Sequence, residues 1–273
     1  MKCCPAPAVL LARCSISALA LAVTAGMATA QSDNPWDGIY AGVNAGGASN
    51  STCHSWMPSG NTIDPAMVTA FGNRYCPNGG TFVGGVQIGD NFQYKRLFWG
   101  IGADFDVWTA RSQNQSLKYT GAALPTGAYA FSDKLGPDGF AAIGPRIGYA
   151  GHQLLTYLRV GAMFPVGPDK STFSYTPAGA AKPIASFSGG RNFASTGWVA
   201  GGGAEWGLNG PWSITAEYLH ANLGKGADAT ATCTGSAAAC AAFSGISFES
   251  IHTGFSANIF RVGINYWFGY WEP

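Results

Sequence analysis

The chain has few charged residues and no long apolar run. Charged residues make up 11% of the sequence, against about 25% in an average soluble protein. The apolar run from Ile16 to Val23 is shorter than the roughly 20 residues that a membrane-spanning helix needs. The low charge is untypical of a soluble protein, and the missing run excludes a bundle of membrane helices. Together they are typical of a transmembrane β-barrel.

The first 30 residues have the features of a secretory signal peptide. Lys2 and Arg13 make the start basic, the apolar run follows, and the small residues 28–30 form a cleavage site before Gln31. A lipoprotein signal at Cys14 is the alternative, but the arginine directly before that cysteine fits it poorly. The sequence therefore predicts a signal peptide over 1–30 and one exported domain over 31–273.

The mature chain also lacks any excess of positive charge. Removing residues 1–30 takes away two cations and no acid, so the formal net charge falls from +1 to −1. This balance gives no support for nucleic-acid binding, which calls for a basic surface.

Four cysteines remain after the signal peptide is removed: Cys53, Cys76, Cys233 and Cys240. An even number in an exported chain favours disulfides, and the spacing favours pairs 53–76 and 233–240. Metal binding is the alternative, but no two cysteines have the two-residue spacing of metal sites and the neighbouring His54 stands alone. We expect no metal and no cofactor.

Glycine is abundant, and apolar residues alternate with it. In the stretch 195–223, Trp198, Trp206 and Ile214 lie on one row, while Gly203, Glu205 and Glu217 lie on the other. A period of two on both sides of a short turn predicts an antiparallel hairpin. In an outer-membrane barrel the apolar row faces lipid and the other row faces a narrow lumen.

The same alternation recurs along the chain and predicts eight strands. They are expected over 36–48, 81–93, 97–107, 140–149, 158–164, 198–206, 212–218 and 256–268. Long polar segments over 47–79, 109–138, 165–194 and 224–251 alternate with short turns. The fold class is therefore all-β, an eight-stranded antiparallel up-and-down barrel with long extracellular loops and short periplasmic turns. A bulge at Asp90 or Pro145 would shift the register by one.

Several segments together resemble a known family. GGTFVGGVQIGDNFQ, GIGADFDVW, GWVAGGGAEW, WSITAEYLHANLG and FRVGINYWF are similar to the small alphaproteobacterial outer-membrane proteins with OmpA-like barrels, the porin-like immunogenic surface antigens. The resemblance implies a place in the outer membrane of a Gram-negative bacterium and surface-exposed loops. The partners it implies are outer-membrane lipid and the barrel-insertion machinery; the loop partner is unknown.

The inward rows carry charges that must share a confined lumen. These are Asp104, Asp106, Arg146, Arg159, Glu205, Glu217 and Arg261. An unpaired buried charge costs several kcal/mol, so we expect a salt-bridge network that plugs the barrel, with Glu217 and Arg261 as the leading pair. A gated channel or a proton path is the alternative reading of the same residues, which would make the barrel a small porin-like passive channel.

Two further alternatives concern the loops and the rim. The candidates for a lipid-acting enzyme are His220 and His252 with Ser247 or Ser250, but no nucleophile motif surrounds these serines. We therefore expect no catalytic site. A haem ligand at His54 or His252 is another alternative. Loop aromatics could anchor a partner or pack the loops on one another; they are Trp56, Phe71, Tyr75, Tyr119, Tyr129, Phe173 and Tyr175.

Overall fold

The computed structural model describes residues 35–61, 63–72, 74–76, 78–109, 112–117, 119, 121–134, 137–167, 171–189, 196–224 and 229–268. The expected signal peptide and the last five residues lie outside the described part of the chain. Within the described residues, no helix is both long and apolar enough to span a membrane.

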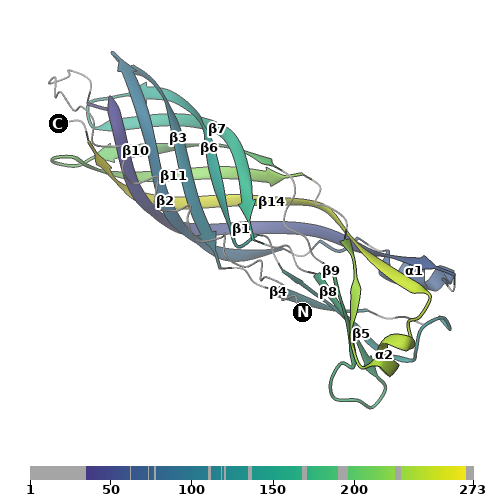
Figure 1. Cartoon of the computed structure of the whole chain (residues 1–273). Helices are drawn as coiled ribbons and strands as arrows, with labels where there is room; N and C mark the ends of the chain where they lie inside the picture. The colour runs from purple at the N-terminus through teal and green to yellow at the C-terminus, as the bar shows by residue number, and fades with distance from the viewer. Residues whose placement is uncertain are drawn as a thin grey trace, which may run out of the picture. The chain divides into compact units, whose positions relative to one another are not determined.

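Eight antiparallel strands close into a barrel, as the alternation predicts (Figure 1). Sheet order follows chain order, and the first strand pairs with the last to complete the ring. The barrel strands are β1 (Gly38–Gly60), β2 (Asn78–Tyr94), β3 (Leu97–Trp108), β6 (Gly139–Ala150), β7 (Leu154–Val166), β10 (Gly197–Gly207), β11 (Trp212–Leu223) and β14 (Ile246–Trp267).

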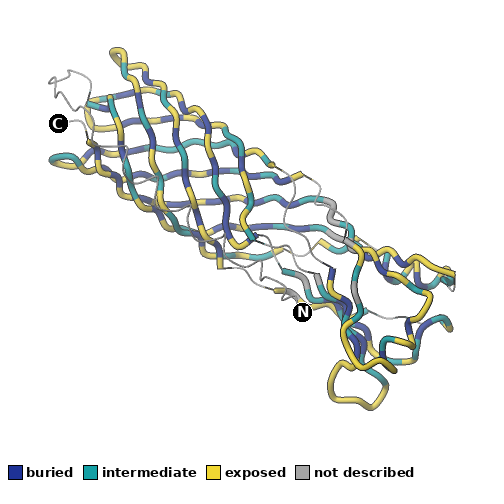
Figure 2. Tube along the Cα trace, viewed as in Figure 1, coloured by how far each residue is buried: buried dark blue, intermediate teal, exposed yellow. Residues whose placement is uncertain are grey.

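The two rows of each barrel strand differ in burial as expected. Trp198, Ile214 and Val262 face outward and are 50%, 44% and 50% exposed. Buried and exposed residues alternate along the barrel strands in Figure 2. The apolar rows are therefore on the outside, where a membrane barrel meets lipid, and the opposite rows fill the interior.

The strand register runs without a shift through both residues that could have broken it. Asp90 pairs with Ile39 on one side and Ile101 on the other, in line with its neighbours. Pro145 pairs with Ile101, and the β6–β7 register is the same on both sides of the proline. The register shift between β1 and β14 lies instead at Cys53/His54. The predicted inward and outward rows therefore need no correction.

The expectation that the four long segments are loops is wrong for much of their length. The strands β1 and β14 continue well past the ends predicted for them. Five strands of a second sheet, in the order β13-β9-β8-β5-β4, come from three different segments. They are β4 (Ser112–Leu117), β5 (Gly127–Lys134), β8 (Ser171–Pro177), β9 (Ala185–Gly189) and β13 (Thr232–Gly235). The remaining elements are α1 (Pro65–Phe71), β12 (Ala229–Thr230) and α2 (Ala237–Ala241).

An aromatic core holds this second sheet together. Phe173 is fully buried, and its ring lies 5.1 Å from Phe71, 5.6 Å from Tyr129 and 5.2 Å from Phe248. Trp56, from the extended part of β1, packs on the same cluster. The reading in which the loop aromatics pack on one another is therefore correct for all of them except Tyr75, which is not part of this cluster.

The second sheet, its aromatic core and the helices α1 and α2 form a loop domain. Two disulfides and one carboxylate join its segments. Cys53 is bonded to Cys76 and Cys233 to Cys240. Asp64 caps α1 by accepting the Met67 amide at 2.7 Å, and its other oxygen accepts the Tyr119 hydroxyl at 2.6 Å. One side chain thus joins the segment after β1 to the segment after β3.

We expect Phe173→Ala to unfold the loop domain and leave the barrel intact. Truncating a buried Phe costs about 3–5 kcal/mol, and the aromatic cluster is separate from the barrel interior. Limited proteolysis should cleave the loops much faster while the barrel keeps its folded gel mobility. Val68→Ala, at an exposed position of α1, is the control and should change neither property. Loss of the folded barrel band in Phe173→Ala would contradict the expectation.

Acid should loosen the attachment of α1. The hydrogen bond from Tyr119 lowers the pKa of Asp64 below its ordinary value. A carboxyl with a depressed folded pKa stabilises the fold above its unfolded pKa of about 4 and loses that contribution as pH falls through the folded value. Hydrogen exchange of the α1 amides should therefore lose protection below about pH 4. In Tyr119→Phe the loss of protection should be smaller and should be complete at a higher pH, because the folded pKa of Asp64 then lies closer to its unfolded value; an unchanged profile would contradict the role of this bond.

Candidate functional site: the barrel lumen

The barrel interior is divided into three layers along its axis. Every barrel strand contributes to an apolar layer at the loop end, made of Ala48, Val83, Trp108, Phe140, Ala142, Met163, Val199, Leu219, Ala221, Leu223, Phe255, Ala257 and Ile259. A second apolar layer, at the turn end, consists of Trp36, Tyr40, Phe98, Ala150, Leu155, Tyr157 and Trp267. The charged residues lie between them, so the middle layer is shielded from water at both ends.

Arg261 is the centre of the charged layer. Its guanidinium contacts Glu217 at 2.6 Å, Asp106 at 2.6 Å and Asp104 at 2.8 Å. Glu217 is its direct cross-strand neighbour, whereas both aspartates come from β3 on another side of the ring. Arg261 is 1% exposed, and these charge-assisted hydrogen bonds replace the water that it lost.

Arg159 extends the same network to β7. Its guanidinium lies 2.5 Å from Asp104 and 3.5 Å from Glu217, so Asp104 and Glu217 each contact two arginines. The Tyr157 hydroxyl donates to Glu217 at 3.2 Å. Both carboxylates are thereby held between cations from different strands.

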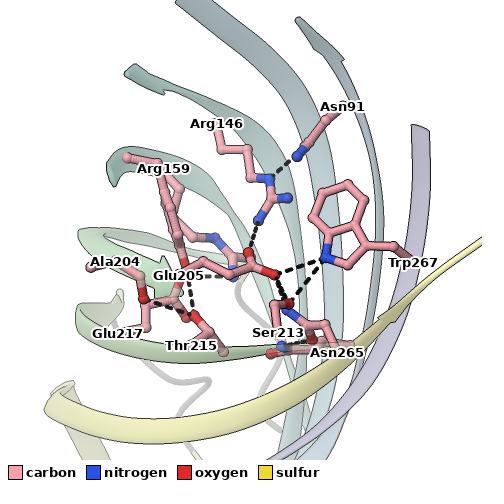
Figure 3. Close-up of polar contacts among 12 residues, drawn as sticks. Asn91, Arg146, Arg159, Ala204, Glu205, Ser213, Thr215, Glu217, Asn265 and Trp267 are labelled. Carbon is pink, nitrogen blue, oxygen red and sulfur yellow. Dashed lines mark hydrogen bonds and ion pairs between the residues drawn. The ribbon is translucent and has the colours of Figure 1, made fainter. Parts of the chain in front are cut away.

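Arg146 and Glu205 form a second group nearer the turn end (Figure 3). Their side chains approach to 3.9 Å. Arg146 donates to Asn91 at 2.8 Å, and its guanidinium lies 4.3 Å from the centre of the Tyr40 ring. Glu205 accepts bonds from three groups of β11 and β14: Ser213 at 2.5 Å, Asn265 at 2.7 Å and Trp267 at 3.2 Å.

The structure thus brings all seven predicted lumen residues into one buried layer, but it adds partners that the sequence reasoning missed. Tyr40, Tyr157 and Trp267 are aromatic residues on inward rows. Parity alone could have placed Tyr157 and Trp267 there, because they lie two and six positions from Arg159 and Arg261 of their own strands. Inward glycines make room for them: a Cβ at Gly89 would collide with the ring of Tyr40.

Little space is left within the charged layer. The cavity there has a volume of about 10 Å³ and is lined by residues that include Tyr40, Arg146, Arg159 and Glu217. A single water needs roughly 10–15 Å³. The cavity therefore offers a ligand no room.

Of the residues of the enzyme alternative, only His220 and Ser247 have described side chains, and these two are not assembled into a site. His220 pairs with Asn258 of β14, whereas Ser247 comes eleven positions before Asn258 in that strand, a separation of about 36 Å at 3.3 Å per residue. That separation is far beyond hydrogen-bond reach. The side chains of Ser250, His54 and His252 lie outside the described residues, so the haem alternative is untested. No group of three or more metal-ligating side chains is found among the positions that the structure covers.

Comparison with known proteins gives a family match over most of the chain. The family model described as "Outer membrane protein beta-barrel domain" matches residues 18–268. The 31 kDa outer-membrane immunogenic protein of Brucella melitensis biotype 1 is 30% identical over 193 residues, which are 70% of this chain and 72% of the relative. The Brucella suis protein of the same name matches equally well.

Solved structures show weaker similarity. The outer membrane protease OmpT of Escherichia coli has a TM-score of 0.44 and 10% identity, over 85% of this chain and 97% of that chain. Ail of Yersinia pestis has a TM-score of 0.27 and 13% identity, over 82% and 99% of the two chains. Similarity at this level carries no argument about function.

Neutralising Arg261 should destabilise the barrel. Arg261→Met leaves three buried carboxylates without their shared cation, and breaking a buried ion pair from one side costs about 3–5 kcal/mol. We expect the thermal unfolding transition, followed by the loss of folded gel mobility, to move clearly downward. Arg96→Gln, which removes an exposed arginine from a short turn, is the matched control and should leave the transition in place. A transition unchanged in Arg261→Met would contradict the central role of this residue.

Proposed function

The chain belongs to the outer membrane protein beta-barrel domain family, and we propose that it is a structural surface protein whose lumen is closed and whose folded loops face the exterior. Its location is the outer membrane of a Gram-negative bacterium. The family is one of outer-membrane barrel proteins and is not an enzyme family. The proposal beyond this concerns the lumen and the loops.

The proposal that the lumen is closed rests on the layered interior of the barrel. A conducting barrel needs a continuous water path. At the loop end, the ring centres of Trp108 and Phe140 lie 5.4 Å apart. At the turn end, the ring centres of Tyr40 and Trp267 lie 5.2 Å apart. Between them the arginines and carboxylates bond to each other. We infer that the charges stabilise the barrel and do not form an ion path.

The second sheet supports the proposal for the loops. One face of it packs on the aromatic core, and the other carries small hydroxyl residues such as Ser132, Thr172 and Ser188, which are cross-strand neighbours. A folded surface of this kind presents a fixed shape to the exterior. The Brucella relative is named an immunogenic protein, and a stable exposed loop domain fits the role of a surface antigen for this chain as well.

Single-channel recording in planar bilayers tests the closed lumen. Refolded protein, with its fold checked by gel mobility in the same preparation, should insert without producing steady current steps. The same preparation should retain intact disulfides, so that the native loop domain is present during the recording. Steady, reproducible conductance would contradict the closed lumen and favour the passive-channel alternative.

A further inference from the structure

One sector of the outer barrel surface changes from apolar to polar before the strands end. On β14 the outward residues Val262 and Phe260 are followed toward the loops by Asn258 and Ser256. The strands on either side show the same change. The outward polar residues are His220 and Asn222 on β11 and Ser49 and Ser51 on β1.

These polar residues form rows across three neighbouring strands. The row nearest the loops consists of the cross-strand partners Asn222, Ser256 and Ser51. The next row toward the turns consists of His220, Asn258 and Ser49. The Nδ1 atom of His220 lies 2.8 Å from the Oδ1 atom of Asn258. By contrast, the outward row of β3 remains apolar as far as Val107 and that of β7 as far as Val166.

A pocket lies where this polar sector meets the loops. It has a volume of about 320 Å³ and is lined by Ser51, Cys53, Arg74, Asn222, Leu223, Gly224, Gly254, Phe255 and Ser256. That volume lies within the range of small-molecule sites, about 300–1,000 Å³. The disulfide from Cys53 to Cys76 fixes the chain two residues beyond Arg74, so the arginine is anchored beside the pocket.

The pocket has the charge and the donors for an anion. Its lining includes one cation, Arg74, and no Asp or Glu. In the part of the chain that the structure describes, no carboxylate forms an ion pair with Arg74. A guanidinium can bind phosphate through two parallel hydrogen bonds. The hydroxyls of Ser51 and Ser256 and the amide of Asn222 can bond to phosphate or to sugar hydroxyls.

We propose that this pocket binds the phosphorylated sugar headgroup of a glycolipid in the outer leaflet. Ser51, Asn222 and Ser256 of its lining belong to the outward rows at the loop end of the barrel, which is the level of the outer-leaflet headgroups. The outward apolar residues Phe260, Val262 and Ile264 continue from it along β14 and can carry acyl chains. A free phosphate would use the arginine but not this apolar row, which is why a lipid fits the surface better.

Native mass spectrometry of the refolded, detergent-solubilised protein tests the site. The protein is titrated with bisphosphorylated lipid A, with the same glycolipid stripped of its phosphates, and with inorganic phosphate. We expect one glycolipid molecule to bind with preference, and Arg74→Gln to weaken its binding by about tenfold, since one charge-assisted contact is lost. Asn222→Leu should weaken binding by a smaller factor while leaving the charge in place.

Arg96→Gln, at the opposite end of the barrel, is the matched control and should bind like the wild type. Equal binding by the wild type and Arg74→Gln would overturn the site. Equal affinity for the phosphate-free glycolipid would show that the apolar surface alone is responsible and would overturn it too. Competition by inorganic phosphate at the same concentration as the lipid would overturn the assignment to a glycolipid. None of these outcomes depends on whether the lumen conducts.

Discussion

The guanidinium of Arg261 meets three carboxylates inside a barrel too narrow to hold bulk water. Burying charges of this kind costs several kcal/mol for each ion unless partners are held in good geometry. The partners come from β3 and β11, and the network continues through Arg159 and Asp104 to β7. The positions of the strands around the ring are therefore coupled to one another by the need to keep this cation paired.

The apolar layers at the two ends of the lumen make pairing of the buried charges still more necessary. Water excluded by the aromatic rings cannot replace a missing partner, and electrostatic attraction is stronger in a less polar surrounding. Glu205 illustrates the result, because it is fully buried and one of its carboxylate oxygens accepts bonds from Ser213, Asn265 and Trp267. Charge in the middle and apolar packing at the ends are thus two parts of a single stable interior.

The outer surface of the barrel has an apolar region and a polar region. Outward apolar rows match lipid, and a polar sector on β1, β11 and β14 lies at the loop end of the barrel beside Arg74. Beyond the barrel, the long strands β1 and β14 carry Trp56 and Phe248 into the aromatic core of the loop domain. The barrel thus supplies rigid supports for an exposed domain that has its own hydrophobic core.

The eight strands, the direction of their rows and the inward charges could be predicted from the sequence, because alternation is a local property that repeats every two residues. Two things were decided by the tertiary structure alone. Asp106 and Arg261, 155 positions apart, meet across the lumen because of strand tilt and stagger, which no local pattern encodes. The loop domain was hidden for the same reason: Phe71, Tyr129 and Phe173 lie in Gly- and Ser-rich segments without a long period, and they become a core only when three separate segments come together.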